Sequence, residues 1–297
     1  MKYKIFILFA LLGTLVSCND SDIFEKEMYK NRVALISSDY YNSFNEVVHL
    51  DNEEKIGYIA ASVGGTHAPE KEMVILLEED PAPLATYNYH LFDADESLYA
   101  KMLPKDKYEI EDYQIHIKAG ERTGRTAVKL HPEGLSPDSA YFISLKATDV
   151  SGVELNPKKS TILYQVMIEN DYASQAKNSL YIMTGTADDM ATAANKTLFP
   201  LSHNSVRMVA GTEPFVLRES ELKKTSLVLT VGDDHKVTIT PYGSLAVKQV
   251  DNDPKYPNTF MVEEAFGLKT NVFLLCYEYT IGKTTKLMKE RVEMQVR

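Results

Sequence analysis

The sequence contains no tryptophan and only two cysteines, Cys18 and Cys276. With so few cysteines, disulfides cannot hold the chain together, so its hydrophobic cores must be large enough to stabilise it alone. Cys276 lies in an apolar stretch and is interpreted as a small buried residue rather than as a nucleophile. The absence of tryptophan counts against a high-affinity site for sugar rings, because tryptophan is the strongest stacking platform.

Positive charge is also scarce. The chain carries 32 Lys and Arg residues against 42 Asp and Glu residues, which gives a formal net charge of -10. Such an acidic chain is a poor counter-ion for phosphate backbones. Nucleic acid is therefore disfavoured as a partner.

Long hydrophobic runs are absent except near the start of the chain. The apolar segment Ile5–Val16 follows a basic start and is shorter than the roughly 20 residues that a membrane-spanning helix needs. A basic start, a short apolar segment and a small residue, here Ser17, form the layout of an export signal. The stretch Leu15-Val16-Ser17-Cys18 resembles the lipobox of bacterial lipoproteins, in which the signal is cut before the cysteine and lipid is attached to it.

This resemblance predicts a lipoprotein signal peptide over residues 1–17, lipidation of Cys18 and a polar tether over residues 18–30. Acyl chains on Cys18 would anchor the protein to the outer membrane. The alternative is a buried N-terminal helix with an incidental cysteine, but the apolar run stops at Cys18 and polar residues follow.

Alternation of apolar and polar residues predicts β-strands along nearly all of the remaining chain. In the first half, strands are expected at residues 32–36, 46–50, 57–61, 72–77, 113–117, 126–130, 141–147 and 162–168. In the second half, they are expected at residues 179–183, 205–209, 225–231, 236–241, 245–250, 259–265, 272–280 and 285–296. The polar stretch 170–177 lacks periodicity, so we expect one domain over residues 31–170 and a second over residues 176–297.

Turn-forming residues at 119–124 predict a hairpin between the strands at 113–117 and 126–130. Helical periodicity is scarce, and only two short helices are expected, near Glu96–Lys101 and Asp188–Ala194.

In the second half, the short loops Gly232–His235 and Tyr242–Ser244 predict antiparallel neighbours, and a meander of about eight strands can close into a small barrel. The last strand should bury one face, with Met288, Val292, Met294 and Val296, and expose the other.

The first half resembles a known domain. Met102-Leu103-Pro104, Tyr108, the segment Tyr113–Gly120 and Asp149-Val150-Ser151-Gly152 are similar to the N-terminal domain of exported Bacteroidetes lipoproteins, a domain of unknown function of the DUF1735 type. This resemblance implies an immunoglobulin-like β-sandwich. The chain departs from the pattern at Tyr141–Ser144, where the family often has a proline after a Tyr-Leu pair.

The second half resembles the domain that usually accompanies it, of the DUF4361 type, at Leu198–Leu201, Lys236–Gly243, Tyr256–Phe260 and Phe273–Tyr279. Together the two resemblances imply a cell-surface lipoprotein encoded among polysaccharide-utilisation genes, with an oligosaccharide or polysaccharide as ligand and a TonB-dependent transporter complex as a further partner. They imply no cofactor and no catalytic residues. The residues Asp138-Ser139-Ala140 also resemble an O-glycosylation signal of this phylum, although a simple turn explains them equally well.

No catalytic or metal motif stands out. The glycine pairs lack phosphate-binding spacing, and the seven histidines are dispersed, so neither a nucleotide site nor a zinc site is expected. Asp93–Glu96 and Asp251–Asp253 offer oxygen ligands for calcium, but neither continues into a full binding loop. Glu78–Asp80 and Glu263–Glu264 offer carboxylates for a glycosidase, but no pair can be placed across a cleft. We therefore expect no enzyme and no metal site.

Tyrosine is abundant, with eighteen copies, and its ring can stack on the C–H face of a pyranose. The best candidate for glycan binding is Tyr87-Asn88-Tyr89-His90, which follows Asp80-Pro81-Ala82-Pro83 and is expected in a long exposed loop. The other tyrosines that strand alternation does not explain are Tyr40, Tyr41, Tyr172, Tyr242 and Tyr256.

The sequence thus predicts an all-β protein with an immunoglobulin-like sandwich followed by an antiparallel, lipocalin-like barrel or a second sandwich. Its expected function is that of a non-catalytic, glycan-binding outer-membrane lipoprotein that assists polysaccharide uptake. Two alternatives remain open, a fimbria-like adhesin or structural surface protein and a glycoside hydrolase.

Overall fold

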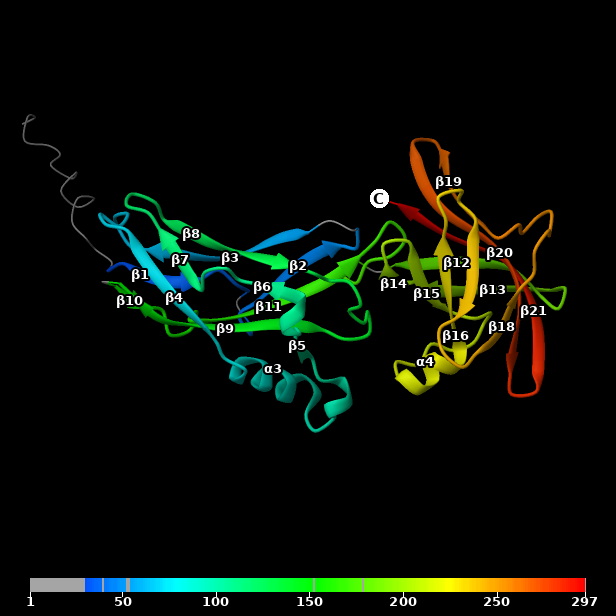
Figure 1. Cartoon of the computed structure of the whole chain (residues 1–297), viewed down its shortest axis with the longest axis horizontal. Helices are drawn as coiled ribbons and strands as arrows, with labels where there is room; N and C mark the ends of the chain where they lie inside the picture. Colours follow the sequence, from blue (N-terminus) through cyan, green and yellow to red (C-terminus); the bar gives the residue numbers. More distant parts are fainter. Residues whose placement is uncertain (1–29, 39, 52–53, 152, 178, 297) are drawn as a thin grey trace, which may run out of the picture.

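The computed structural model describes residues 30–38, 40–51, 54–151, 153–177 and 179–296. The expected signal peptide, Cys18 and all of the expected tether before residue 30 lie outside these residues. Two domains follow one another along the long axis of the molecule (Figure 1), and each has its own hydrophobic core. No helix in the described part of the chain is long and apolar enough to span a membrane.

The N-terminal domain is a sandwich of two β-sheets. The first sheet has the order β10 (Glu154–Leu155), β1 (Arg32–Leu35), β3 (Lys55–Gly64), β8 (Thr123–Leu130) and β6 (Tyr108–Glu109). The second has the order β2 (Ser43–His49), β11 (Thr161–Glu169), β9 (Tyr141–Val150), β4 (Met73–Glu79) and β7 (Gln114–Ile117), and β5 (Lys101–Met102) pairs with β9.

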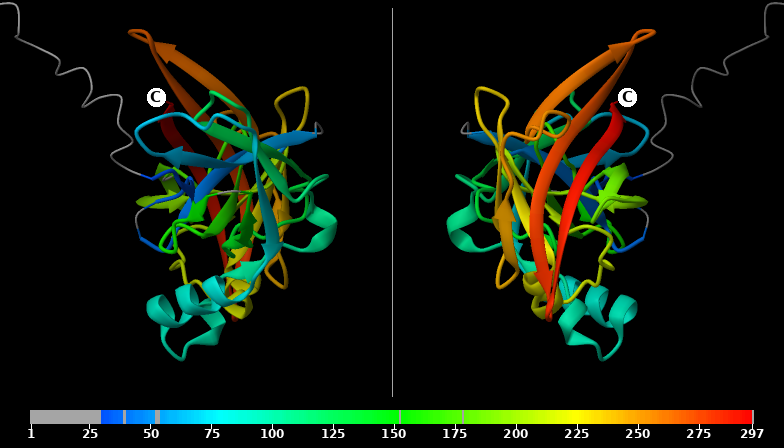
Figure 2. Two further views of the ribbon diagram at one scale, coloured as in Figure 1. Left: turned by 90° about the vertical axis from the view of Figure 1, so that its left-hand side faces the viewer. Right: turned by 90° about the vertical axis from the view of Figure 1, so that its right-hand side faces the viewer.

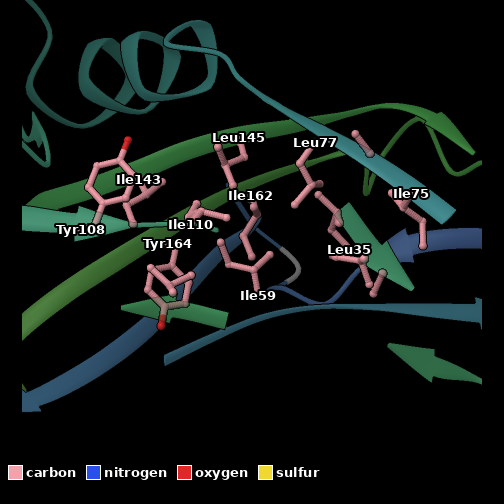
Figure 3. Packing of buried hydrophobic residues seen from close by; sticks show 14 of the residues in the cluster. Leu35, Ile59, Ile75, Leu77, Tyr108, Ile110, Ile143, Leu145, Ile162 and Tyr164 are labelled. Carbon is pink, nitrogen blue, oxygen red and sulfur yellow. The ribbon is translucent and has the colours of Figure 1, made fainter. Parts of the chain in front are cut away.

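Alternating side chains form the core between these sheets. On β3, Ile59, Ala61 and Val63 are buried, whereas Tyr58, the residue before Ile59, points to the other face and is 40% exposed. Figure 3 shows residues of the first sheet, such as Ile59, packing against residues of the second, such as Ile162. Full burial of each aliphatic side chain contributes about 1.5–3 kcal/mol, so a core of this size can stabilise the domain without a disulfide.

The C-terminal domain also has two curled sheets. One has the order β13 (Met190–Thr197), β12 (Leu180–Ala187), β21 (Thr284–Val296), β20 (Leu268–Ile281) and β18 (Ala246–Gln249), with β19 (Thr259–Ala265) also on β20. The other has the order β14 (Phe199–Ser202), β15 (Ser205–Val209), β16 (Ser226–Val231) and β17 (Val237–Pro241). The prediction of an all-β, two-domain protein is confirmed. Cys276 is fully buried in this domain, and burial raises the pKa of its thiol.

Two predicted strand pairings are wrong. The strands β7 and β8 lie in different sheets, because β7 pairs with β4 while β8 pairs with β3 and β6. Likewise β17 pairs with β16, as the Gly232–His235 loop predicted, but after Tyr242–Ser244 the chain crosses to the other sheet, where β18 pairs with β20. Alternation identifies a strand, but it does not say which neighbour the strand's backbone will bind.

The helix predictions also need correction. Residues 82–92 form the helix α3 (Ala82–Phe92), not a loop, and α4 (Glu219–Thr225) was not expected. Glu96–Lys101 contains only a single 3₁₀ turn, η2 (Glu96–Leu98), and another 3₁₀ turn, η3 (Lys105–Lys107), follows it. In both Figure 1 and Figure 2, α3 and α4 lie on the same side of the molecule, opposite the hairpin of β19 and β20.

The expected helix at Asp188–Ala194 is instead a β-hairpin. Ala187 pairs with Met190, so Asp188 and Asp189 form a two-residue loop, and both have positive φ angles of 50° and 63°. Two such residues in succession are typical of the type I′ turn that connects antiparallel strands.

The predicted inward face of β21 is only partly confirmed. Met288 and Val292 are fully buried, but Val296 is 41% exposed. Glu290, between them, points the same way and is also fully buried. Its carboxylate accepts hydrogen bonds from Lys196 Nζ at 2.6 Å and from the Tyr277 hydroxyl at 2.8 Å.

Candidate functional site

Two prolines that the sequence analysis had assigned to a loop lie at the start of the helix α3. Pro81 precedes the helix and Pro83 lies in its first turn, where proline is favoured because the amide there has no partner within the helix. Asp80 accepts a hydrogen bond from the Ala82 amide at 3.0 Å. This pattern was the signal for a helix start.

The helix packs on the outer face of the second sheet. Leu84 is buried with Phe142 of β9 and Leu163 of β11 in a small hydrophobic cluster. Tyr87 packs against this cluster, with its ring centroid 5.2 Å from that of Phe142. The inner half of α3 is therefore structural, and its outer half faces solvent.

A second segment brings two more tyrosines to the same place. Tyr41 has a positive φ of 59°, which is uncommon for a residue other than glycine. The following Asn42 (φ 52°) donates hydrogen bonds to Lys158 O and Thr161 Oγ1, which hold this turn in place. Strained positions of this kind cluster at functional sites.

We call the resulting cluster the aromatic patch and define it as Tyr40, Tyr41, Tyr87, Tyr89 and His90. The ring centroids of Tyr41 and Tyr87 are 5.1 Å apart, those of Tyr40 and Tyr41 are 4.3 Å apart, and both pairs meet edge to face. Tyr41 lies 6.1 Å from His90, and His90 lies 6.4 Å from Tyr89. The sequence analysis had named these two segments separately, and the fold joins them.

The patch has an exposed rim and a half-buried centre. Tyr40 is 73% exposed and Tyr89 is 63% exposed, whereas Tyr41 and Tyr87 are half-buried. Tyrosine is neutral at physiological pH, and burial raises the pKa of both Tyr41 and Tyr87 further, so their hydroxyl groups remain hydrogen-bond donors. Exposed ring faces beside neutral hydroxyl groups suit a ligand that is itself both apolar and hydroxylated.

Asn88 does not belong to this surface. It is only 5% exposed, and its amide exchanges two hydrogen bonds of 2.9 Å with the backbone of Ala100. The sequence analysis had named Asn88 as a glycan-binding residue. Its side-chain amide is instead buried and hydrogen-bonded to Ala100, so it attaches α3 to the chain that follows the helix. We therefore exclude Asn88 from the candidate site.

The other tyrosines named from the sequence lie elsewhere. Tyr172 packs edge to face on Phe260, with centroids 4.9 Å apart, and Tyr242 packs on Arg207. Tyr256 follows Asp253, whose carboxylate accepts a hydrogen bond from the Tyr256 amide. None of these three joins the aromatic patch.

Glu79 and Glu263, two of the carboxylates considered for catalysis, are bound to cations. Glu79 accepts hydrogen bonds from Lys105, Tyr108 and Tyr113. Burial alone would raise the pKa of Glu79, but these hydrogen bonds outweigh it and lower the pKa. The hydrogen bonds from Arg291 likewise lower the pKa of Glu263.

Carboxylates considered for calcium binding also accept hydrogen bonds from within the protein. Asp95 caps η2 by accepting a hydrogen bond from the Ser97 amide, and Asp253 accepts hydrogen bonds from the amides of Lys255 and Tyr256. Within the described ranges, no group of three or more His, Cys, Asp or Glu side chains is arranged to hold a metal ion.

One ion pair joins the two domains. Arg207 of β15 is 1% exposed and donates two hydrogen bonds to the carboxylate of Asp138, which precedes β9. Its guanidinium carbon lies 4.6 Å from the ring centroid of Phe199 and 4.9 Å from that of Tyr242. Asp138 thus has a structural partner, which supports the turn interpretation of Asp138-Ser139-Ala140.

Comparisons with known proteins agree with this architecture. A family model of an N-terminal domain matches residues 24–154, and a family model of a C-terminal domain matches residues 160–294. No curated protein matches the sequence.

Several solved structures share the fold. A Bacteroides ovatus protein of unknown function is 14% identical, with a TM-score of 0.65 and 94% of each chain covered. A multidomain protein from the same species that includes DUF1735 is 16% identical, with a TM-score of 0.62, covering 89% of this chain and 94% of the other. An auxiliary nutrient binding protein from Bacteroides thetaiotaomicron is 12% identical, with a TM-score of 0.59, covering 86% and 92%. Residues 24–154 therefore match the model of an N-terminal domain and residues 160–294 that of a C-terminal domain, and the chain shares the fold of two-domain Bacteroides proteins, one of which includes DUF1735.

Proposed function

We propose that the protein is an outer-membrane surface lipoprotein that captures a glycan without cleaving it and passes it to an uptake system. The observation that carries this proposal is the aromatic patch, where Tyr40 and Tyr89 present exposed rings around a half-buried centre. A pyranose ring has an apolar C–H face that stacks on such rings and hydroxyl groups that bind neutral phenols.

The shared fold supports a binding role. One structural neighbour is named an auxiliary nutrient binding protein, and its similarity to this chain extends over both domains. We transfer to this chain only the general role of binding a nutrient. The choice of a glycan as that nutrient rests on the aromatic patch.

A non-catalytic role agrees with the electrostatics of the carboxylates. A glycosidase needs a carboxylic acid with a raised pKa to protonate the leaving group. Glu79 and Glu263 instead have lowered pKa values. Glu79 accepts hydrogen bonds from Lys105, Tyr108 and Tyr113, and Glu263 accepts hydrogen bonds from Arg291.

The membrane anchor is a separate part of the proposal, and Cys18 lies outside the described residues. Cys18→Ala should move the protein from the membrane fraction to the soluble fraction. If the variant remains with the membrane, Cys18 does not provide the anchor.

The binding proposal is tested by a glycan-array screen of the full chain beside Tyr89→Ala and the matched variant Tyr58→Ala. Tyr58 is 40% exposed on β3, away from the patch, and its ring packs under Arg125. We expect wild type and Tyr58→Ala to bind the same glycans, with weaker signals for Tyr89→Ala. Absence of any binding by the wild type would contradict the proposal.

A second candidate function is that of an adhesin or structural subunit. The hairpin of β19 and β20 favours it, because Val262, Phe266 and Leu268 are 53%, 104% and 54% exposed. Exposed apolar side chains gathered on one protrusion often mark a protein contact. Binding of a surface protein that is lost in Phe266→Ser, together with a negative glycan array, would favour this function.

A further inference from the structure

A cavity of about 470 Å³ lies where the two domains meet. Gln165 and Met167 of β11 and Ser139 line it from the N-terminal domain. Thr197 and Phe199 line it from the C-terminal domain, and Lys177 lines it from the segment between the domains. Its volume falls within the range of small-molecule sites, which commonly occur at domain interfaces.

The walls of this cavity are held in place. Asp138, itself part of the lining, binds the buried Arg207 across the interface. Gln175 donates a hydrogen bond to Pro137 O at 2.8 Å and accepts one from the Ile168 amide at 2.7 Å. These contacts fix the part of the wall formed by Pro137, Asp138 and Gln175.

Several polar groups on the lining are free to bind a ligand. Among the described residues, no hydrogen bond or ion pair involves the side-chain amide of Gln165, the Thr197 hydroxyl or the Lys177 ammonium. Phe199 adds apolar surface rather than a free stacking face, because its ring already packs against Phe215, with centroids 5.2 Å apart, and against the Arg207 guanidinium. An amide, a hydroxyl and an aromatic ring around one space match the alternating polar and apolar surface of a sugar.

The charge in the cavity is positive, in contrast to that of the whole chain. Asp138 and Lys177 are its only ionisable lining residues among the described ones, and Asp138 is neutralised by Arg207. Lys177 is left as an unpaired cation, and Lys101 Nζ lies 3.0 Å from Ser139 Oγ on the lining. On a chain with a net charge of -10, this local excess favours an anionic group.

The cavity and the hydrophobic cluster that supports the aromatic patch lie on the same face of β11. Alternate residues of β11 point the same way, so Leu163, Gln165 and Met167 lie on its outer face. Leu163 belongs to the cluster under α3, and Gln165 and Met167 line the cavity. Successive positions of this series are about 7 Å apart along the strand, so Leu163 and Met167 are about 13 Å apart, a span that one oligosaccharide can bridge.

We propose that the interdomain cavity is a second saccharide subsite, and that it selects a sugar unit with a carboxylate, such as a uronic or a sialic acid. This inference rests on the proposed glycan-binding function. The Lys177 ammonium would bind the carboxylate, and Gln165 and Thr197 would bind hydroxyl groups of the ring.

The test uses the full chain with ¹³C-labelled methionine methyl groups. Met167 reports on the cavity, and Met102, which packs against the same hydrophobic cluster as Tyr41 and Tyr87, reports on the aromatic patch. Met167→Leu and Met102→Leu assign the two resonances. The probes are glucuronic acid, galacturonic acid and N-acetylneuraminic acid, each titrated beside its neutral methyl ester.

We expect at least one acid to shift the Met167 resonance saturably, with its ester binding about fivefold more weakly, the upper range for a solvent-exposed charge pair. Lys177→Ala should remove this preference, Gln165→Leu should weaken both ligands, and Lys248→Ala, an exposed lysine on β18, should change neither. Equal binding of acid and ester, or no shift of Met167 with any probe, would overturn the inference. A shift of Met102 alone would overturn it while supporting glycan binding at the patch.

Discussion

The buried pair of Lys196 and Glu290 allows a quantitative prediction about the C-terminal domain. The Glu290 side chain is 0% exposed and that of Lys196 is 4% exposed, and their charged atoms are 2.6 Å apart. Tyr277 donates a further hydrogen bond to Glu290 and accepts one from the Gly211 amide, both at 2.8 Å. These four groups form one network inside the domain.

Glu290→Gln removes the negative charge but keeps the shape of the side chain. It leaves the Lys196 ammonium buried without its counter-ion, and burial already lowers the pKa of Lys196. Breaking a buried pair in this way costs about 3–5 kcal/mol. This is a large part of the roughly 5–15 kcal/mol that stabilises a typical domain.

The assay is unfolding in urea, monitored by hydrogen exchange of peptides from β20 and β21. These peptides report the free energy of unfolding of the C-terminal domain alone. Glu219→Gln is the control, because Glu219 pairs with Lys223 on α4 and its side chain is 77% exposed. This control should not change the unfolding midpoint measurably.

The double variant Lys196→Met, Glu290→Leu should recover most of the lost stability, since apolar replacement of a buried pair is often neutral or stabilising. A cost below about 1 kcal/mol for Glu290→Gln would refute the reasoning, because a buried charged pair cannot lose one partner so cheaply.

Two further predictions concern the N-terminal domain and its contact with the C-terminal domain. Arg207→Lys should loosen the domain contact, because lysine replaces a bidentate, stacked guanidinium with a single point charge, and small-angle scattering should show a larger radius of gyration. An unchanged radius would contradict this. The pKa of Glu79 in the folded protein is below its ordinary value of 4.5, so its contribution to stability is complete above pH 4.5 and is lost as the pH falls through the folded pKa. Glu79→Gln should therefore flatten the pH dependence of the unfolding midpoint below pH 4.5, and a curve parallel to that of the wild type would contradict the assignment.

Much of the fold could be predicted because a strand with one buried face leaves a two-residue period in the sequence. The strands β15, β19 and β21 lie within a residue of the expected ranges. The pairing of the strands could not be predicted in the same way. The chain between β7 and β8 has the composition of a hairpin loop, yet it crosses between sheets, because pairing depends on contacts made far away in the sequence.

The candidate site was only half visible in the sequence. Tyr89 and His90 were named, but their place on a helix was missed because Pro83 was taken as a loop residue. Their contact with Tyr41 follows from the packing of α3 on the second sheet, and no local pattern encodes it. Glu290 was missed for a different reason, since its buried partner Lys196 lies on another strand.

The most direct test of the proposed function is calorimetric titration of the strongest array glycan into wild type, Tyr58→Ala and the double variant Tyr40→Ala, Tyr89→Ala. The proposal predicts at least a tenfold loss of affinity, about 1.4 kcal/mol, for the double variant, and no change for Tyr58→Ala. Equal affinity for all three proteins would contradict the assignment of glycan binding to the aromatic patch.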